Sequence, residues 1–394
     1  MSSRLWILDP GFENVGGHHY ELNRAIVADC ARRGTGVRIA AHREIHGEAA
    51  DLPVDRIFSH SIYAESYSGG RREPIRRRCL EDLASLPGWR FAPDDVLLLH
   101  SVAPAHFMAV CEWFAGLPAD GRPRSVVLHT VGWFGDEWTQ GVFEWSAEFR
   151  RAAELLARAA GPGVTFAAAN EPLCEDWAVH AGQPARLHPI PCPVIADTRN
   201  RPAPPSAAPR FAFLGGARRE KGFELLPDLI PLLARRCPES EILVQAAPVP
   251  ATCPDTIDRL RELERSCPPL RIHWGEAPAA EYHRLLAASD IVLHPYDPVR
   301  YQVRGSGVFF ESMASGLPVV LPGSTWMAEE WTHWDAGGAL FGGWRAEAVV
   351  EAAAGVARSY AGHRARSLQA AERWNAKHSV AAFVDFVLGA PHPG

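Results

Sequence analysis

The chain has 394 residues, of which 47% are hydrophobic and 22% charged, with a net charge of −6. This length exceeds a single ordinary core, so two or more domains are expected. The net negative charge argues against non-specific binding of nucleic acid through the overall charge of the protein. No apolar run reaches the roughly 18 residues of a membrane-spanning helix. The eight cysteines are scattered without a CxxC pair, which favours reduced, structural thiols. We therefore expect a cytoplasmic protein.

The first half of the chain alternates short β-branched runs with longer helical patterns. A helical spacing of apolar residues follows the first run, and 139–160 reads as a long amphipathic helix. Strands alternating with helices indicate βαβ units and a parallel sheet. The expected strands of this half are RLWILD (4–9), VRIAAH (37–42), DDVLLLH (94–100), SVVLHTV (125–131) and TFAAAN (165–170).

A glycine pair joins the first expected strand to the first expected helix. Gly16 and Gly17 form a weak relative of a phosphate loop, because the spacing lacks the GxGxxG and GKS/T patterns. His18 and His19 follow at the helix entrance and are expected to face a cleft. Adjacent residues on a helix point in different directions, so this histidine pair does not predict a metal site.

A proline-rich segment divides the chain into two halves. Residues 199–210 hold four prolines and almost no large apolar residue, as is typical of a linker. The alternation then restarts, and the last helical pattern, 371–389, is compatible with either half. The expected strands of the second half are RFAFLGG (210–216), EILVQAA (241–247), LRIHWG (270–275), DIVLHPY (290–296) and PVVLPG (318–323).

The stretch FLGGARREKGFELL (213–226) gathers cations where an apolar strand meets an apolar helix. Glycine allows close approach of the backbone to a ligand, and a helix N-terminus presents free N–H groups with a partial positive charge. Cations there oppose the helix dipole unless an anion is bound. The stretch therefore predicts an anion site at Gly216, Arg218 and Lys221, with a helix starting near Gly222; a basic, solvated loop is the alternative.

A second stretch, VRYQVRGSGVFFESMASGLPVVLP (299–322), opens a helix with small residues. Glu311 lies one turn into this helix among apolar neighbours, so it is expected to be partly buried. A carboxylate behind a phosphate-binding turn suits hydroxyl groups, and a ribose diol is the natural partner. A solvated helix-face glutamate is the alternative.

These segments together resemble the retaining enzymes of glycosyltransferase family 4. The resemblance runs from the GG turn through IPCPV (190–194) to GGARREKG, LLAASDIVLHPY (285–296) and RGSGVFFESMASGLPVV. It implies an α/β protein of GT-B fold, in which two Rossmann-like domains face each other across a cleft. The implied parts are an acceptor-side domain (1–198), a hinge (199–209), a nucleotide-sugar-binding domain (210–370) and C-terminal helices (371–394) that pack back on the first domain.

The resemblance also implies roles for single residues. Arg218 and Lys221 would hold a diphosphate, and Glu311 would bind ribose. The backbone of Ser306 and Gly307 would support phosphates or sugar, and the turn at 16–17 would meet the phosphates from the other domain. The implied donor-binding set is completed by Gly216, Tyr296, Arg304 and Gly305. Such enzymes generally need no metal or other cofactor, and none is expected here.

The chain departs from the family pattern at two positions, one expected to contact the transferred sugar and one in the glycine loop of GGARREKG. The family often has a glutamate eight positions before Glu311, where this chain has Val303. Arg304, Tyr296 or Asp297 would then hold the sugar hydroxyls. An arginine often follows the first loop glycine, where this chain has Gly216. The identity of the sugar is thereby left open.

The family usually has a histidine of the first domain near the sugar. His129 is the candidate, as the resemblance implies, and His100 is the second choice. Both end expected strands, where site residues belong. WFGDEWTQ (133–140) follows His129, and its Trp133 is expected on the acceptor side together with His18 and His19.

Five arginines are gathered at SGGRREPIRRR (68–78). About 1 kcal/mol per basic residue near anionic lipid would make five arginines a membrane anchor at the inner face of the membrane. An anionic acceptor and a solvated loop are the alternatives. The residues are Arg71, Arg72, Arg76, Arg77 and Arg78.

The sequence thus predicts a retaining, hexosyl-type transferase that acts on a nucleotide-diphosphate-sugar and a hydroxyl-bearing acceptor. An epimerase or phosphorylase of the same fold, and a non-catalytic nucleotide-sugar-binding protein, are the alternatives. An epimerase would act without acceptor, a phosphorylase would require inorganic phosphate, and a binding protein would show no turnover.

Overall fold

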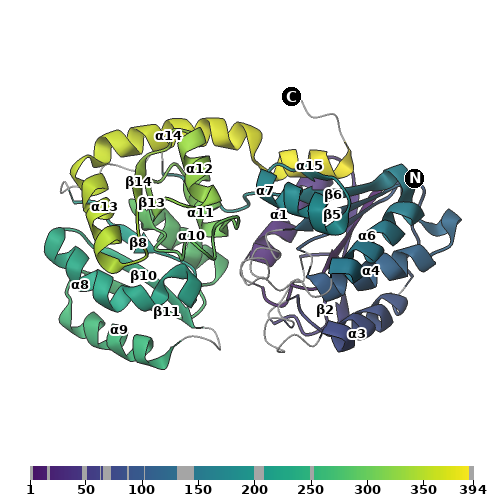
Figure 1. Cartoon of the computed structure of the whole chain (residues 1–394), viewed down its shortest axis with the longest axis horizontal. Coiled ribbons are helices and arrows are strands. Elements are labelled where there is room, and N and C mark those ends of the chain that lie inside the picture. The colour runs from purple at the N-terminus through teal and green to yellow at the C-terminus, as the bar shows by residue number, and fades with distance from the viewer. Residues whose placement is uncertain are drawn as a thin grey trace. The chain divides into compact units, whose positions relative to one another are not determined.

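The computed structural model (Figure 1) divides into two compact units, each of which has its own sheet. Unit 1 comprises Met1–Pro193 with Ser379–Gly394, and unit 2 comprises Val194–His378. The structure describes residues 3–15, 18–46, 51–62, 64, 72–86, 88–101, 103–130, 146–198, 208–248 and 253–389. Most of the expected hinge lies outside these ranges. In the described part, no helix is long and apolar enough to cross a membrane.

The described sheet of unit 1 has seven parallel strands in the order β3-β2-β1-β4-β5-β6-β7. This is the doubly wound order, in which the strand order reverses between β1 and β4. The five expected strands are present, and β3 and β7 are additional. The strands are β1 (Arg4–Asp9), β2 (Gly36–His42), β3 (Val54–Phe58), β4 (Val96–Leu99), β5 (Ser125–Thr130), β6 (Val164–Ala168) and β7 (Ala185–Leu187).

Helices cover this sheet, and one of them comes from the far end of the chain. α15 (Val380–Leu388) packs against α1 and buries Phe383 and Val384 beside Leu5 and Ile7 of β1. Ser379 caps α15 by accepting from the N–H of Ala382, so the helical pattern at 371–389 is two helices. The other α-helices are α1 (His18–Arg32), α3 (Arg72–Ala84), α4 (Pro104–Gly116), α6 (Ser146–Ala160) and α7 (Glu171–Asp176).

The arginine-rich segment is helical from Arg72 onward, so the alternative of a solvated loop was wrong for its described part. Glutamates at helical spacing explain the difference, because i, i+3 and i, i+4 pairs support a helix. Arg76 pairs with Glu73 and Glu112, and Arg78 pairs with Glu81. Arg71 lies outside the described residues. These ion pairs offset much of the positive charge, and membrane contact through the arginines stays a prediction.

The sheet of unit 2 repeats the same topology, with its main path in the order β11-β10-β8-β12-β13-β14 and parallel pairing throughout. The order reverses between β8 and β12. A two-residue strand, β9, pairs with the end of β10. The strands are β8 (Phe211–Phe213), β9 (Gly216–Ala217), β10 (Ile242–Pro248), β11 (Leu270–Trp274), β12 (Ile291–Leu293), β13 (Val319–Pro322) and β14 (Gly338–Phe341).

The helices of unit 2 bury alternate strand residues on both faces of the sheet. Phe211, Phe213 and Leu293 pack with α8 and α13 in one core cluster. On α11, Phe310 stacks on Trp374 of α14, with ring centroids 6.2 Å apart. The helices are α8 (Leu226–Arg236), α9 (Pro254–Ser266), α10 (Ala279–Ala288), α11 (Gly307–Ala314), α12 (Trp326–His333), α13 (Ala346–Arg358) and α14 (Tyr360–Lys377).

The helix after the cationic loop begins with a 3₁₀ turn. Arg219–Lys221 form a single 3₁₀ turn, and Gly222 then adopts a left-handed conformation with φ of 76°. A second 3₁₀ turn precedes α8, which starts at Leu226 with a proline in its first turn. The chain is thus helical directly after Gly222, as expected, and becomes α-helical at Leu226. The cations lie in an irregular loop stabilised by backbone turns.

We predict that Gly222→Ala strongly destabilises unit 2. A Cβ at this position would lie 2.0 Å from the carbonyl oxygen of Pro295, in addition to the cost of the left-handed backbone. The expected loss in the free energy of unfolding is at least about 3 kcal/mol. Denaturant unfolding of the full chain measures it.

Gly343→Ala is the matched control, because Gly343 has a φ of 74° and its nearest contact would be an ordinary 3.8 Å. This control should cost about 1–2 kcal/mol, the left-handed penalty alone. Equal losses in the two variants would contradict the close approach of Gly222 to Pro295.

Candidate anion and diol site

The carboxyl ends of β8 and β12 bring the two conspicuous sequence stretches together in unit 2. Ligands of doubly wound sheets bind where the strand order reverses, and β8 and β12 flank that point. The loop after β8 carries Arg218 and Lys221, and the segment after β12 leads through Tyr296 to α11. We call Gly215, Arg218, Lys221, Tyr296, Ser306 and Glu311 the carboxyl-edge cluster.

A glycine gives the loop after β8 its close packing. Gly215 has a φ of 105°, and its N–H donates to Oε1 of the buried Gln245 at 2.9 Å. A Cβ on Gly215 would lie 3.1 Å from the Lys221 ammonium and 3.4 Å from Val308 in the first turn of α11. The glycine loop, the lysine and the start of α11 therefore meet at one point.

Lys221 occupies an unusual electrostatic position. Its ammonium lies 5.8 Å from the centroid of the Tyr296 ring. In the described part of the chain, this ammonium has no ion pair or hydrogen bond. Burial, together with the nearby charge of Arg218, lowers the pKa of Lys221 to about 8. The lysine is thus still mostly cationic at pH 7 and forms no ion pair among the described residues, although the charges of Glu220 and Glu311 act on it.

Arg218 adds a second cation beside the glycines. Its side chain packs on Gly216, where a Cβ would lie 3.6 Å from the guanidinium Nε. Its ion pair with Glu220 is long, at 4.0 Å. Its carbonyl accepts from the N–H groups of Lys221 and Phe223, which folds the loop back on itself. The arginine is therefore held near the lysine by backbone geometry.

Ser306 precedes α11 but does not cap it. Its hydroxyl lies 3.1 Å from the Tyr296 hydroxyl in a buried hydrogen bond, and it makes no capping bond to the first turn of α11. A Cβ on the next residue, Gly307, would meet nothing within 4 Å. Helix N-termini attract anions, and this one opens into free space beside the cluster.

The remaining residues expected at the donor site have mixed placements. Gly305 packs against the Phe310 ring, where a Cβ would lie 2.4 Å from a ring carbon. The Arg304 guanidinium lies 5.2 Å from the Tyr301 ring centroid, and Asp297 accepts from the N–H of Val299. Glu311 is 9% exposed and accepts a hydrogen bond from Tyr282. These placements give Gly305 a packing role and leave Glu311 as a buried acceptor.

His294 is a feature that the sequence reasoning did not single out. It follows β12 directly, is fully buried, and both its ring nitrogens lack a hydrogen-bond partner within the described ranges. Its ring packs on Tyr296 and Phe309, with centroids 5.2 and 6.1 Å away. Burial and the charge of Lys221 lower its pKa to about 3. A neutral imidazole therefore lies behind the cationic loop.

In unit 1, polar residues also gather where β1 and β4 end. The Asp9 carboxylate accepts from Asn23 at 2.6 Å and lies 2.8 Å from His19 Nδ1. Burial raises the pKa of Asp9, but His19, His100 and Asn23 outweigh it, and the value falls to about 2. Asp9 was missed from the sequence, although it ends a strand.

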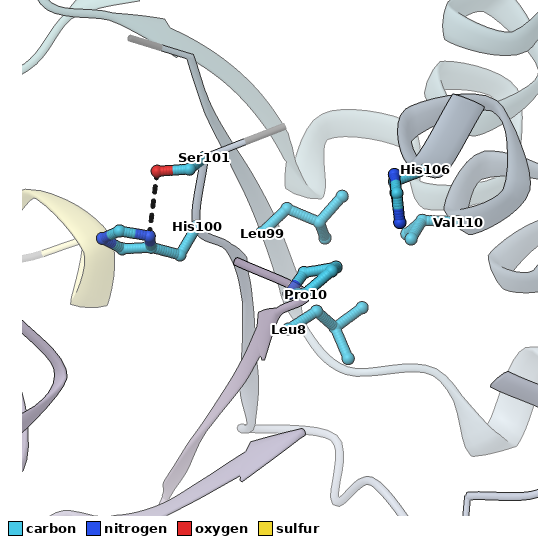
Figure 2. A pocket seen from close by; sticks show the side chains of 7 residues that line it. All are labelled: Leu8, Pro10, Leu99, His100, Ser101, His106 and Val110. Atoms are coloured by element: carbon cyan, nitrogen blue, oxygen red, sulfur yellow. Dashed lines mark hydrogen bonds between the residues drawn. The ribbon is translucent and has the colours of Figure 1, made fainter. Parts of the chain in front are cut away.

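His100 lies beside this carboxylate and borders a small pocket (Figure 2). Its Nδ1 is 3.7 Å from Asp9 and 3.0 Å from the Ser101 hydroxyl. Burial lowers its pKa to about 4. Figure 2 shows His100 and Ser101 on one side of the pocket and His106 on the other, with apolar residues between them. The pocket is lined by Leu8, Pro10, Leu99, His100, Ser101, His106 and Val110.

Asp9, His19 and His100 also have donor atoms within 4.8 Å of one another, close enough to share a metal ion. However, both oxygens of Asp9 already accept hydrogen bonds, one from Gly11 and one from Asn23. The group is therefore stable as a hydrogen-bonded network.

The other residues expected in unit 1 are placed as follows. His19 is buried against Asp9, whereas the neighbouring His18 is exposed. His129 lies in β5, but its side chain is outside what the structure describes. Gly16, Gly17 and Trp133 lie outside the described residues. Their expected roles stay predictions.

Comparisons with known proteins identify the fold. No protein-family model matches the chain, and neither does any curated protein. Solved structures do match: WaaG, a glycosyltransferase involved in lipopolysaccharide biosynthesis, is 15% identical with a TM-score of 0.63, over 98% of this chain and 100% of that one. HepE from Anabaena in complex with UDP-glucose is 14% identical with a TM-score of 0.63, and 98% of each chain is covered.

A third match is the trehalose-6-phosphate synthase OtsA, which is 13% identical with a TM-score of 0.66 over 98% of both chains. The structures that this chain resembles are GT-B glycosyltransferases, and the chain has the GT-B fold. The predicted fold is thereby confirmed. Membership of family 4 stays a prediction.

We predict that Lys221→Met stabilises the unliganded protein at pH 7. The substitution keeps the volume of the side chain and removes a desolvated ammonium that forms no ion pair in the part of the chain that the structure describes. The pKa shift predicts a gain of about 1–3 kcal/mol in the free energy of unfolding. A loss of stability would show that the ammonium is already compensated by the protein.

Proposed function

We propose that the chain is a glycosyltransferase that moves a hexose-type sugar from a nucleotide-diphosphate-sugar to a hydroxyl acceptor, with retention of anomeric configuration. The observation that carries this proposal is the Lys221 ammonium, which lies beside the glycine loop at the switch point between β8 and β12 without a counter-ion among the described residues. A doubly charged pyrophosphate supplies the missing charge, and the GT-B fold supports this choice.

In this proposal, the diphosphate lies between the cationic loop and the start of α11. Lys221 and Arg218 bind its oxygens, and the N–H groups of Gly216, Ser306 and Gly307 add donors. Charged hydrogen bonds of this kind contribute on the order of 1.5–3 kcal/mol each. The UDP-glucose complex of HepE supports a UDP-sugar as the first donor to examine.

The chemical step then needs little more than fixed charge. The bond between the sugar C1 and the β-phosphate oxygen breaks, and the electron pair leaves with the diphosphate. The acceptor oxygen bonds to C1 on the same face, and its proton passes to the leaving phosphate. Arg218, Lys221 and the α11 N-terminus stabilise the negative charge that develops. No protein base is required, and we assign His129 to the sugar rather than to proton transfer.

Glu311 binds the ribose hydroxyls in this arrangement, because a buried carboxylate accepts from two hydroxyl groups. Tyr296, Arg304 and Asp297 hold the sugar where relatives often have a glutamate at the place of Val303. Arg304 and Tyr296 lie on the same segment as Ser306. The acceptor binds to unit 1, through His18 and Trp133.

We predict that the affinity for a sugar nucleotide falls as pH rises above 8. The bound diphosphate favours the charged lysine, so affinity is full below the pKa of the free protein, about 8, and is lost above it. Between pH 7 and 9.5 the dissociation constant for UDP-glucose should rise about tenfold. Isothermal titration calorimetry at both pH values measures it.

Two variants of Lys221 separate its charge from its shape. Lys221→Arg should abolish the pH dependence, since a guanidinium stays protonated. Lys221→Ala should weaken UDP-glucose about tenfold or more but leave uridine binding unchanged. An equal loss for UDP-glucose and uridine would remove Lys221 from the phosphate site.

The function itself is tested with a panel of UDP-, GDP-, ADP- and dTDP-sugars. Thermal shift identifies the donor, because a specific ligand stabilises the fold by mass action. Turnover is then followed by proton NMR, which reports the anomer formed. We expect acceptor-dependent release of nucleoside diphosphate with retention. Three other outcomes would contradict the proposal. Isomerisation without acceptor would indicate an epimerase, and a requirement for inorganic phosphate would indicate a phosphorylase. Binding without turnover would indicate a non-catalytic binding protein.

A further inference from the structure

A tyrosine from a neighbouring helix is bonded to the candidate ribose-binding carboxylate. The Tyr282 hydroxyl of α10 donates to Oε2 of Glu311 on α11, a contact between residues 29 positions apart. Both helices are drawn in green in Figure 1. Tyr282 is not recognisable from the sequence, since an isolated tyrosine in a helical pattern is typical of a packing residue.

Glu311 needs such a donor. Only 9% of the residue is exposed, and a buried carboxylate is costly unless hydrogen bonds satisfy it. Its charge acts on Lys221 and on Tyr296, which both belong to the carboxyl-edge cluster. Tyr282 therefore contacts a carboxylate that is electrostatically coupled to the cluster.

The hydrogen bond also fixes the orientation of the carboxylate. Each carboxylate oxygen has two acceptor positions. The bond from the Tyr282 hydroxyl takes up one of the positions of Oε2. A carboxylate that is fixed in this way loses less rotational freedom when the diol binds.

We infer that Tyr282 is a positioning residue that orients Glu311 towards the ribose diol and so makes the site discriminate ribonucleotides from deoxyribonucleotides. This inference rests on the proposed function, because it takes the ligand to be a nucleotide. Tyr282 acts through Glu311 and is not assigned a contact with the reacting atoms.

A purely structural role would have a different signature. As a latch between α10 and α11, Tyr282 would contribute to stability only, and its loss would weaken every nucleotide to the same degree. The ratio of the dissociation constants for the deoxyribonucleotide and the ribonucleotide separates the two roles, since unfolding and global loosening cancel in this ratio.

The experiment compares Tyr282→Phe with the unaltered chain by calorimetry. The probes are UDP, GDP and ADP with their 2′-deoxy counterparts, and the pair that contains the tightest ligand is used. We expect the ribonucleotide to bind about fivefold to tenfold more weakly to the variant, and the deoxyribonucleotide to be unchanged. The ratio of the dissociation constants for the deoxyribonucleotide and the ribonucleotide therefore falls by the same factor.

Two further variants define the origin of the effect. Glu311→Gln should remove the discrimination, and Tyr282→Phe added to it should change the ratio no further, because the two residues act as a unit. Tyr360→Phe is the matched control: the Tyr360 hydroxyl also donates to a buried carboxylate of unit 2, that of Asp290, but away from the cluster. It should leave the ratio unaltered.

The outcomes distinguish this inference from the proposed function. If the unaltered chain binds none of the nucleotides, the proposed function fails and the inference fails with it. If the chain binds nucleotides but Tyr282→Phe leaves the ratio unaltered, or if a deoxyribonucleotide is preferred from the start, only the inference fails. A lower ratio in Tyr282→Phe with an unaltered ratio in Tyr360→Phe supports it.

Discussion

The site depends on one electrostatic constraint: a desolvated lysine without a counter-ion in the described part of unit 2. The Lys221 ammonium is held against Gly215 and the ring of Tyr296, where burial lowers its pKa to about 8. Burial of a charged ammonium destabilises the folded protein. Destabilising arrangements of this kind are common at functional sites. The surrounding loop is built so that the lysine stays in place, because Gly222 closes the turn directly against Pro295.

Two kinds of ligand group suit the two ends of this cluster. Cations and open helix N–H groups lie at one end and suit an anion. A buried carboxylate lies at the other end and suits hydroxyl groups, since its negative charge would repel a phosphate. A nucleotide carries both groups in one molecule, with a diphosphate next to a ribose. The position at the reversal of strand order agrees with this assignment.

The sequence predicted the fold well and the site in part. The strands that precede Gly215 and His294 are short buried apolar runs, FAF and IVL, and such runs are readable without a structure. The left-handed conformation of Gly222 was not predicted, because it depends on packing against Pro295. The sequence did not reveal the roles of Tyr282, His294 and Asp9. These roles depend on contacts between segments that are distant in the chain, and no local sequence pattern predicts such contacts.

The most direct test of the central claim is a crystal structure of the chain with a bound sugar nucleotide. The account predicts diphosphate oxygens within hydrogen-bonding distance of the Lys221 ammonium and the Arg218 guanidinium, with the first N–H groups of α11 completing the site. A diphosphate bound elsewhere would contradict this claim. So would a Lys221 ammonium that stays at the Tyr296 ring and makes no contact with the diphosphate.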